Sequence, residues 1–161
     1  MQIADSLRVR ARNEQDVLQV VGWVPDAAAL YLFSGTRLTW PLTAQQLQSM
    51  VGVDGVTSSV VVLPSGDLVG HFDLAIDASV ARLGRVIVNP ALRGRGLAIT
   101  VVHLALAEAQ QLGVEVVRLN VISTNEPAIR TYRRAGFTAV AGNPDRAGVI
   151  VMERALGAVA L

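Results

Sequence analysis

The apolar and polar positions at the start of the chain predict a strand followed by a helix. Residues 6–11, SLRVRA, alternate between apolar and polar side chains, as a half-buried strand does. The next segment, EQDVLQVVGW, is preceded directly by Asn13. An asparagine at that position accepts a hydrogen bond from an amide of the first helical turn, and Asp16 within that turn suits the helix dipole. A helix capped by Asn13 is therefore expected.

Two further short helices are expected in the same region. One begins at Pro25, covers DAAALYLF and is ended by Gly35. The other is opened by Thr43, because Gln46 three residues later completes a capping-box pattern, and this helix extends to Gly52.

Apolar runs separated by turn residues dominate the rest of the chain. Within residues 57–77, two β-rich runs flank PSGD, which predicts an antiparallel hairpin. Residues 83–90, LGRVIVNP, form a further strand that Pro90 stops, since proline has no donor for a sheet. The remaining expected elements are an apolar helix over 97–112, a buried strand over 115–122, a short helix within 125–137, and two strands over 137–142 and 147–156.

This order of elements predicts a mixed α/β fold. One βαβ unit combined with antiparallel hairpins favours a mixed sheet with helices on both faces. The length of 161 residues fits one domain over 1–161, without repeats, linkers or low-complexity segments.

Composition excludes several classes of function. Apolar residues make up 52% of the chain and charged residues 17%, so a large core is expected, and a net charge of +1 argues against nucleic-acid binding. The absence of cysteine excludes disulfides, thiolate metal sites and a cysteine nucleophile, and two histidines far apart make a metal site unexpected. Without a secretory signal or an apolar run long enough to span a membrane, a cytoplasmic protein is expected.

The turn VNPALRGRGLA, residues 88–98, carries the first candidate chemistry. The first amides of a helix lack intrahelical partners and favour a negative charge, and Gly94 and Gly96 let the backbone approach a phosphate. A Walker loop is excluded because Leu97 and Ala98 stand where its Lys and Ser/Thr belong, and a dinucleotide fingerprint lacks its third glycine. The turn is interpreted as a pyrophosphate site, the alternative being an ordinary turn with solvated arginines.

Two motifs together resemble the GNAT N-acyltransferase superfamily. They are Arg93-x-x-Gly96-x-Ala98 and, downstream, the segment formed by Asn125, Ala128, Tyr132, Gly136 and Phe137. The resemblance is specific over about residues 67–140, and GWVPDAAALYLFSG and WPLT before it look like enzymes that acetylate protein N-termini or ribosomal proteins. It implies a twisted, mostly antiparallel sheet of six to seven strands with helices on both faces.

The resemblance also implies acetyl-CoA as co-substrate, without a metal. The sheet would split between the strands over 83–90 and 115–122 to admit the cofactor, and the main-chain N–H of Val88 would polarise the thioester carbonyl. Asn125 would contact the pantetheine arm, cap its helix, or do both. The implied cofactor-binding residues are Val86, Ile87 and Val88 along the arm, Arg93, Gly94, Arg95, Gly96, Leu97 and Ala98 at the pyrophosphate, and Asn125.

Tyr132 is the implied catalytic residue, beside the cofactor sulfur. Full proton transfer from a tyrosine (pKa ≈ 10) to a thiolate (≈ 8.5) is uphill by roughly 2 kcal/mol, so a hydrogen bond that strengthens as the sulfur gains charge is the expected role. The alternative is a core aromatic that shares a helix face with Ala128 and Ala135.

The proton acceptor for the attacking amine is less determined. Arg85 lies where some family members have a glutamate, so the candidates are His71 and Asp73, which alternation places on one face of their strand, or a water held by Asn120 or Ser123. The alternative for His71 and Asp73 is a polar, solvated edge.

Two sets of side chains have open assignments. Core packing explains the aromatic residues near the N-terminus as well as an acceptor pocket does. For the helix arginines a solvated face is expected, and the alternative is a contact with the adenosine phosphate of the cofactor. These residues are Trp23, Tyr31, Phe33 and Trp40, and Arg130, Arg133 and Arg134.

These observations predict an N-acetyltransferase that transfers an acetyl group from acetyl-CoA to a primary amine, of a small molecule or a protein N-terminus. Since no cysteine can carry the acyl group, direct attack in a ternary complex is expected. The alternative is a non-catalytic acyl-CoA-binding sensor or interaction module. No nucleic acid or membrane partner is expected, and the tail ALGAVAL could pack against a second copy in a homodimer.

Overall fold

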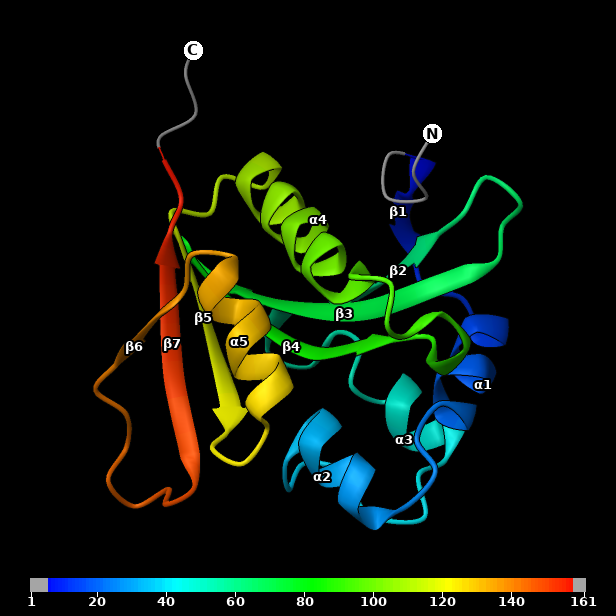
Figure 1. Cartoon of the computed structure of the whole chain (residues 1–161), viewed down its shortest axis with the longest axis horizontal. Helices are drawn as coiled ribbons and strands as arrows, with labels where there is room; N and C mark the ends of the chain where they lie inside the picture. Colours follow the sequence, from blue (N-terminus) through cyan, green and yellow to red (C-terminus); the bar gives the residue numbers. More distant parts are fainter. Residues whose placement is uncertain (1–5, 158–161) are drawn as a thin grey trace.

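The computed structural model describes residues 6–157, which form a seven-stranded mixed sheet covered by helices on both faces (Figure 1). The strand order is β1-β2-β3-β4-β5-β7-β6, and every pair is antiparallel except β4 with β5. The strands are β1 (Arg8–Ala11), β2 (Val56–Val62), β3 (Leu68–Asp77), β4 (Val80–Val88), β5 (Val116–Ile122), β6 (Thr138–Val140) and β7 (Val149–Ala155). The helices are α1 (Glu14–Gly22), α2 (Ala27–Ser34), α3 (Ala44–Gln48), α4 (Leu97–Gln111) and α5 (Glu126–Arg134), with short 3-10 turns η2 (Val53–Gly55) and η3 (Pro90–Leu92). The expected fold class is confirmed.

The sheet separates two hydrophobic cores, because successive side chains of a strand point to opposite faces. Val61 of β2 belongs to the core that includes α4 and α5 on one face, whereas Val60 and Val62 belong to the core that includes α1, α2 and α3 on the other. The apolar helix α4 lies so close to β3 that a Cβ added to Gly70 would be 2.8 Å from Val101 Cγ2. Glycine at position 70 therefore allows the close packing of α4 on the sheet.

Capping explains where the first helices begin and end. Asn13 caps α1 as predicted, and Asp16 returns the hydrogen bond to form a capping box. The expected start of the next helix at Pro25 is wrong, because Asp26 accepts a hydrogen bond from the Ala29 amide at 2.8 Å and α2 begins at Ala27.

The third helix is shorter than predicted, ending at Gln48 rather than Gly52. Thr43 caps it, but the Gln46 side chain reaches back to the Thr39 amide and the Pro41 carbonyl, so the capping box is only half formed.

The PSGD hairpin joins β2 and β3 as predicted, but the following strand begins earlier than expected. Strand β4 starts at Val80 and not at Leu83, and a tight turn at Ala78 pairs it with β3. Ala78 has a φ of +54°, which a turn of this kind requires and which the sequence does not signal, because glycine or asparagine usually takes that position.

Candidate active site

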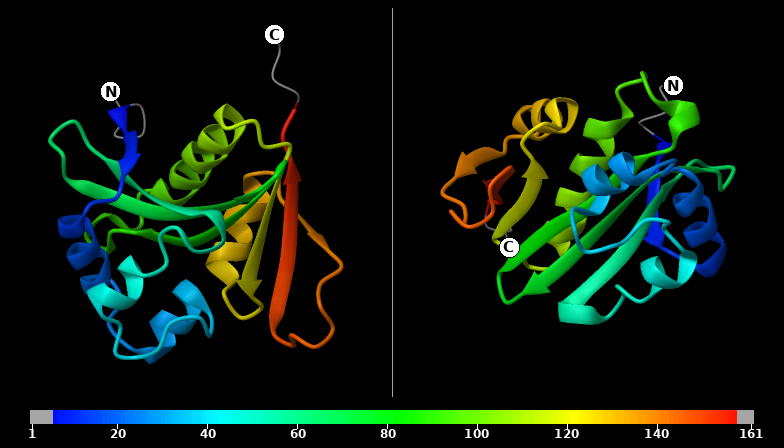
Figure 2. Two further views of the ribbon diagram at one scale, coloured as in Figure 1. Left: turned by 180° about the vertical axis from the view of Figure 1, so that it is seen from behind. Right: turned by 90° about the horizontal axis from the view of Figure 1, so that it is seen from below.

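Strands β4 and β5 diverge midway along their length and open a pocket between them. They pair only over residues 80–83 and 116–119, and beyond these residues they separate, as the left view of Figure 2 shows. The pocket is lined by both strands and by residues of α2, β3 and α5. The split of the sheet expected from the family resemblance is therefore confirmed.

The turn before α4 leaves main-chain amides at an uncapped helix start. Gly94 and Gly96 have φ of +81° and +70°, in the left-handed region that favours glycine, and a Cβ added to either would meet no atom within 4 Å. No side-chain hydrogen bond caps α4. The Arg93 amide is partly engaged with the Pro90 carbonyl at 3.4 Å, so the amides of residues 94–98 are the donors that remain here among the described residues. This arrangement fits a diphosphate.

The second half of β4 has one hydrogen-bonding edge free. The Asn89 amide donates to the Val69 carbonyl of β3 at 2.8 Å, so alternation turns the amide of Val88 toward the side where β5 has moved away. The edge that includes Val86 and Val88 can thus pair with an extended arm, and the Val88 N–H faces the opening.

Tyr132 extends from α5 into the same pocket while most of its ring is buried. Its ring meets that of Phe137 edge-on, with 5.8 Å between the centroids. Burial raises the pKa of Tyr132 to about 12, because the surroundings disfavour the charged phenolate. The hydroxyl is therefore protonated at neutral pH, and within residues 6–157 it has no side-chain or main-chain hydrogen bond.

A β-bulge in β4 contributes a buried ion pair to the pocket wall. The register of β3 and β4 shifts between His71 and Asp73, and Arg85 lies at the bulge with a left-handed φ of +46°. Arg85 Nε donates to Asp73 Oδ2. Asp73 is 2% exposed, and its other oxygen, Oδ1, has no hydrogen-bond partner among the described residues. Asp73 is thus a lining residue of the pocket whose Oδ1 is buried without a hydrogen-bond partner within residues 6–157.

His71 lies beside Asp73, and both of its ring nitrogens are occupied. Nδ1 is 2.8 Å from the Arg85 carbonyl oxygen, which can only accept, so Nδ1 carries the proton. Nε2 then accepts a hydrogen bond from Arg12 at 3.0 Å, while its distance to Asp73 Oδ1 is 3.6 Å. Burial, above all, lowers the pKa of His71, so the ring is neutral at neutral pH.

The alternative of a solvated edge for these two side chains is wrong. His71 is 0% exposed, and β3 lies inside the sheet between β2 and β4. As alternation predicts, Phe72 packs in the core under α4 and α5, whereas the His71 ring faces Phe33 of α2 at 6.1 Å.

The structure divides the other predicted residues between pocket and surface. Asn125 caps α5 through the Ala128 amide at 3.4 Å and also lines the pocket, as does Asn120, whereas Ser123 is outside the lining. Of the four aromatic residues, Phe33 lines the pocket and Trp23 is buried in the core of α1–α3.

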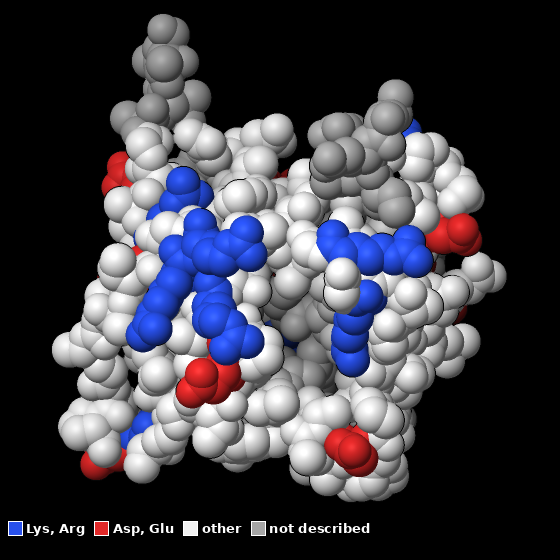
Figure 3. Space-filling view, in the orientation of Figure 1, with Lys and Arg blue, Asp and Glu red and all other residues white. Residues whose placement is uncertain are grey.

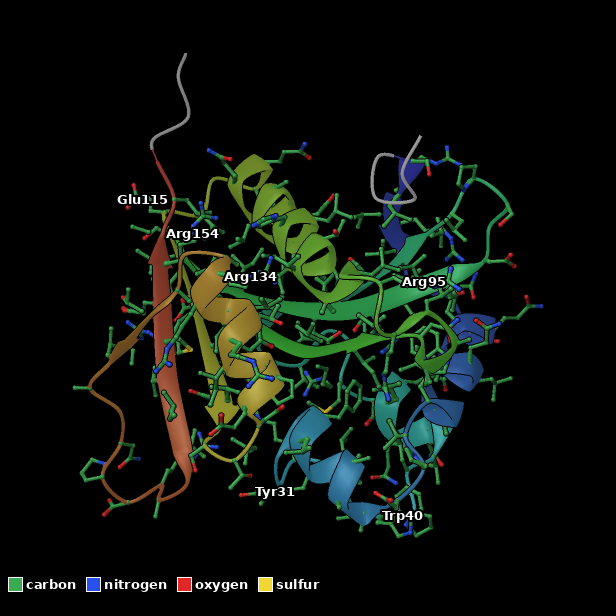
Figure 4. All side chains as sticks on the ribbon, in the orientation of Figure 1. Tyr31, Trp40, Arg95, Glu115, Arg134 and Arg154 are labelled. Atoms are coloured by element: carbon green, nitrogen blue, oxygen red, sulfur yellow. The ribbon has the colours of Figure 1, made fainter. Side chains whose placement is uncertain are left out.

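The two remaining aromatic residues, Tyr31 and Trp40, are 41% and 44% exposed on the outer side of α2 and the following loop (Figure 4). The arginines of α5 are exposed, and Figure 3 shows basic side chains gathered over α5 and over the turn before α4. Figure 4 shows one arginine of each group, Arg134 on α5 and Arg95 in the turn.

Four arginines near the pocket were not predicted from the sequence. Arg12 reaches His71 across 59 positions of sequence, and Arg37, Arg82 and Arg146 line the pocket from three separate segments. No local motif marks any of them, since only the folded sheet brings these segments together.

The comparisons with known proteins agree with this geometry. The sequence matches the acetyltransferase (GNAT) family over residues 29–137. A spermidine N-acetyltransferase from Vibrio cholerae in complex with CoA and spermine has a similar structure, with a TM-score of 0.77, 19% identity, and coverage of 94% of this chain and 96% of that chain. The aminoglycoside acetyltransferase AAC(6')-Ib in complex with coenzyme A and kanamycin is also similar, with a TM-score of 0.73 and 19% identity. The match covers 93% of this chain and 95% of that chain. The GNAT domain of S. lividans PAT has a TM-score of 0.72 and 19% identity, with coverage of 93% of this chain and 90% of that chain.

A sheet that splits beside an uncapped helix start, with a free strand edge and a buried tyrosine in the pocket, suits a transferase whose donor has a diphosphate and an extended arm, as acyl-CoA has. The chain belongs to the acetyltransferase (GNAT) family, because that family matches most of its length. It is accordingly an N-acetyltransferase whose acetyl donor is acetyl-CoA, which confirms the family and the co-substrate expected from the two motifs.

No helix among residues 6–157 is long and apolar enough to cross a membrane.

Proposed function

We propose that this enzyme acetylates a primary amine by direct attack on acetyl-CoA in a ternary complex, with Tyr132 and Asp73 on opposite sides of the reacting atoms. The divergence of β4 and β5 carries the proposal. This divergence leaves the edge of β4 unpaired between the pocket lined by Tyr132 and the turn that leads into α4, which supports a donor extended along that edge.

The donor would bind along the turn and the strand edge. The amides of residues 94–98 would hold its diphosphate, with Arg93 and Arg95 adding charge, and its extended arm would pair with the main chain of Val86, Ile87 and Val88. Asn125, already held by its cap, would contact the arm from α5. The Val88 N–H would donate to the thioester carbonyl oxygen as negative charge develops there.

Tyr132 would donate a hydrogen bond to the departing sulfur. The new bond joins the amine nitrogen to the acetyl carbon, and the carbon–sulfur bond breaks. The attacking nitrogen loses a second proton to solvent as the amide forms, and the thiolate takes one proton. Since the Tyr132 pKa is about 12, this residue remains protonated throughout, and solvent supplies the proton in the net reaction.

Asp73 would receive the amine. Its free Oδ1 would accept a hydrogen bond from the ammonium group, and water in the pocket would carry away the proton released before attack. We assign His71 a positioning role, because its Nε2 lone pair is taken by Arg12 while its Nδ1 fixes the carbonyl of Arg85 in the bulge.

Three further statements belong to the same proposal. The solved structures that hold spermine and kanamycin support an amine as acceptor, since both molecules carry several amino groups. Because the donor is an intracellular metabolite, we place the enzyme in the cytoplasm. A homodimer remains a prediction, and part of the apolar tail on which it rests, residues 158–161, lies outside the described residues.

Release of free CoA in the presence of amines tests the proposal. The chain has no cysteine, so a thiol-specific chromogenic reagent measures CoA without background from the protein. Amine-dependent release above the spontaneous rate, with an N-acetylated product identified by mass, would support acetyl transfer. Tight binding of acetyl-CoA without product from any amine or N-terminal peptide would instead support the sensor.

A further inference from the structure

The pocket between β4 and β5 is lined by an unusual number of basic side chains. Arg37, Arg82, Arg85 and Arg146 belong to its wall, and Asp73 is the one carboxylate among the lining residues. Asp73 is already paired with Arg85. The lining therefore carries an excess of three positive charges, although the whole chain has a net charge of only +1.

The three arginines beyond the bulge have no carboxylate of their own. Arg37, Arg82 and Arg146 form no ion pair within 4.0 Å among residues 6–157, whereas Arg118 on the neighbouring strand face does pair with Glu153. A guanidinium group without a partner has donors free for an oxyanion such as a carboxylate or a phosphate.

Arg82 is the most constrained of the three. It is half-buried, and its pKa is lowered first by burial and then by the positive charges of Arg37, Arg85 and Arg146, against which Asp54 acts in the opposite direction. Partial loss of water and the repulsion between neighbouring cations both make a bound anion favourable at this position.

Beside the bulge, the pocket lining suits a cation instead of an anion. Asp73 lines the same pocket, and its Oδ1 is buried without a hydrogen-bond partner among the described residues, so this carboxylate suits an ammonium group. The pocket lining therefore includes one carboxylate that can accept from a cation and several guanidinium groups that can donate to an anion. A ligand that fits both carries an amine and an acidic group in one molecule.

We propose that the acceptor is a small amine that carries a carboxylate or a phosphate, which the unpaired arginines Arg37, Arg82 and Arg146 bind while Asp73 receives the amine. This specificity rests on the acetyl-transfer function proposed above. Polyamines and other polycations are poor acceptors, because each additional positive charge meets the arginines of the pocket.

Matched pairs of amines test this specificity. Tyramine against tyrosine examines the carboxylate, and ethanolamine against phosphoethanolamine examines the phosphate, with spermidine as the polycation. For each compound, kcat/KM with acetyl-CoA is measured, and its Kd is measured by calorimetry with the CoA-saturated protein. The acidic member of at least one pair is expected to have a kcat/KM and an affinity roughly ten- to a hundredfold higher, as charge-assisted hydrogen bonds provide.

Single substitutions locate the preference. Arg82→Gln and Arg146→Gln are each expected to reduce the advantage of the acidic member about tenfold or more. Arg146 is exposed, so its replacement leaves the packing intact. Arg8→Gln, on the exposed edge strand β1, is the matched control and should retain the advantage.

The outcomes separate this inference from the proposed function. Turnover of amines without any advantage for the acidic members, or with spermidine as the best acceptor, would overturn the inference alone. An advantage that persists in both arginine variants would also overturn it. Tighter binding of the acidic member without turnover would support the inference and count against acetyl transfer.

Discussion

Replacing Tyr132 by phenylalanine removes one hydroxyl and leaves the ring in place. Because burial raises the pKa of Tyr132 to about 12, transfer of its proton to a thiolate with a pKa of about 8.5 is uphill by roughly 5 kcal/mol. A hydrogen bond to the developing thiolate is worth about 1.5–3 kcal/mol. The variant is therefore expected to lose about ten- to a hundredfold in kcat, with the affinity for acetyl-CoA nearly unchanged.

The measurement combines kinetics with a pH profile. Single-turnover rates isolate the chemical step, and calorimetry gives the affinity for acetyl-CoA. Tyr31→Phe is the matched control, because the chain has two tyrosines and Tyr31 is exposed and outside the pocket lining. Between pH 7 and 10 the wild-type rate should show no decline attributable to Tyr132, since a group with a pKa of about 12 keeps its proton over that range.

Two results would refute this reasoning. An unchanged single-turnover rate in Tyr132→Phe would remove the hydrogen bond to sulfur from the mechanism. A wild-type rate that falls with a pKa near 9, and whose fall disappears in the variant, would mean that the tyrosine ionises far more easily than its burial allows.

The other predictions concern the anion site, the helix contact and the buried histidine. Gly96→Glu is expected to abolish acetyl-CoA binding in calorimetry, because it places a negative charge at the diphosphate; retained affinity would exclude this turn as the anion site. Gly70→Ala is expected to lower the free energy of unfolding by about 1–3 kcal/mol in urea denaturation, because its methyl group would lie 2.8 Å from Val101; an unchanged midpoint would contradict the close packing of α4 on β3. The pKa of His71 is lowered in the folded state, so the unfolded chain binds more protons below about pH 6.5. The free energy of unfolding should therefore fall as the pH drops from 7 to 5, by at most about 1.4 kcal/mol per pH unit from this residue. His71→Gln should reduce that dependence; an equal slope in wild type and variant would show that His71 does not titrate differently on folding.

The parts of the site that follow from local sequence were predictable. The uncapped turn and Tyr132 lie within short segments whose spacing specifies a helix start and a helix face, and both are where the motifs place them. Alternation likewise placed His71 and Asp73 on one side of their strand.

The parts of the site that could not be predicted from the sequence depend on contacts between distant segments of the chain. Arg85 marks a departure from a common family pattern in the sequence, but only the pairing of β3 with β4 shows that it lies at a bulge and holds Asp73. The unpaired arginines of the pocket come from three segments, and their excess of charge is invisible in a chain whose overall charge is close to zero.

The short parallel contact between β4 and β5 has a mechanical consequence. Four residue pairs join the part of the sheet formed by β1–β4 to the part formed by β5, β7 and β6, with the packing of α4 and α5 beside them. A molecule lying along the open edge touches both parts at once and adds main-chain bonds where the protein alone makes none. In the proposed binding mode the donor would therefore extend the sheet across the gap, and the enzyme is expected to be more rigid with the donor bound than without it.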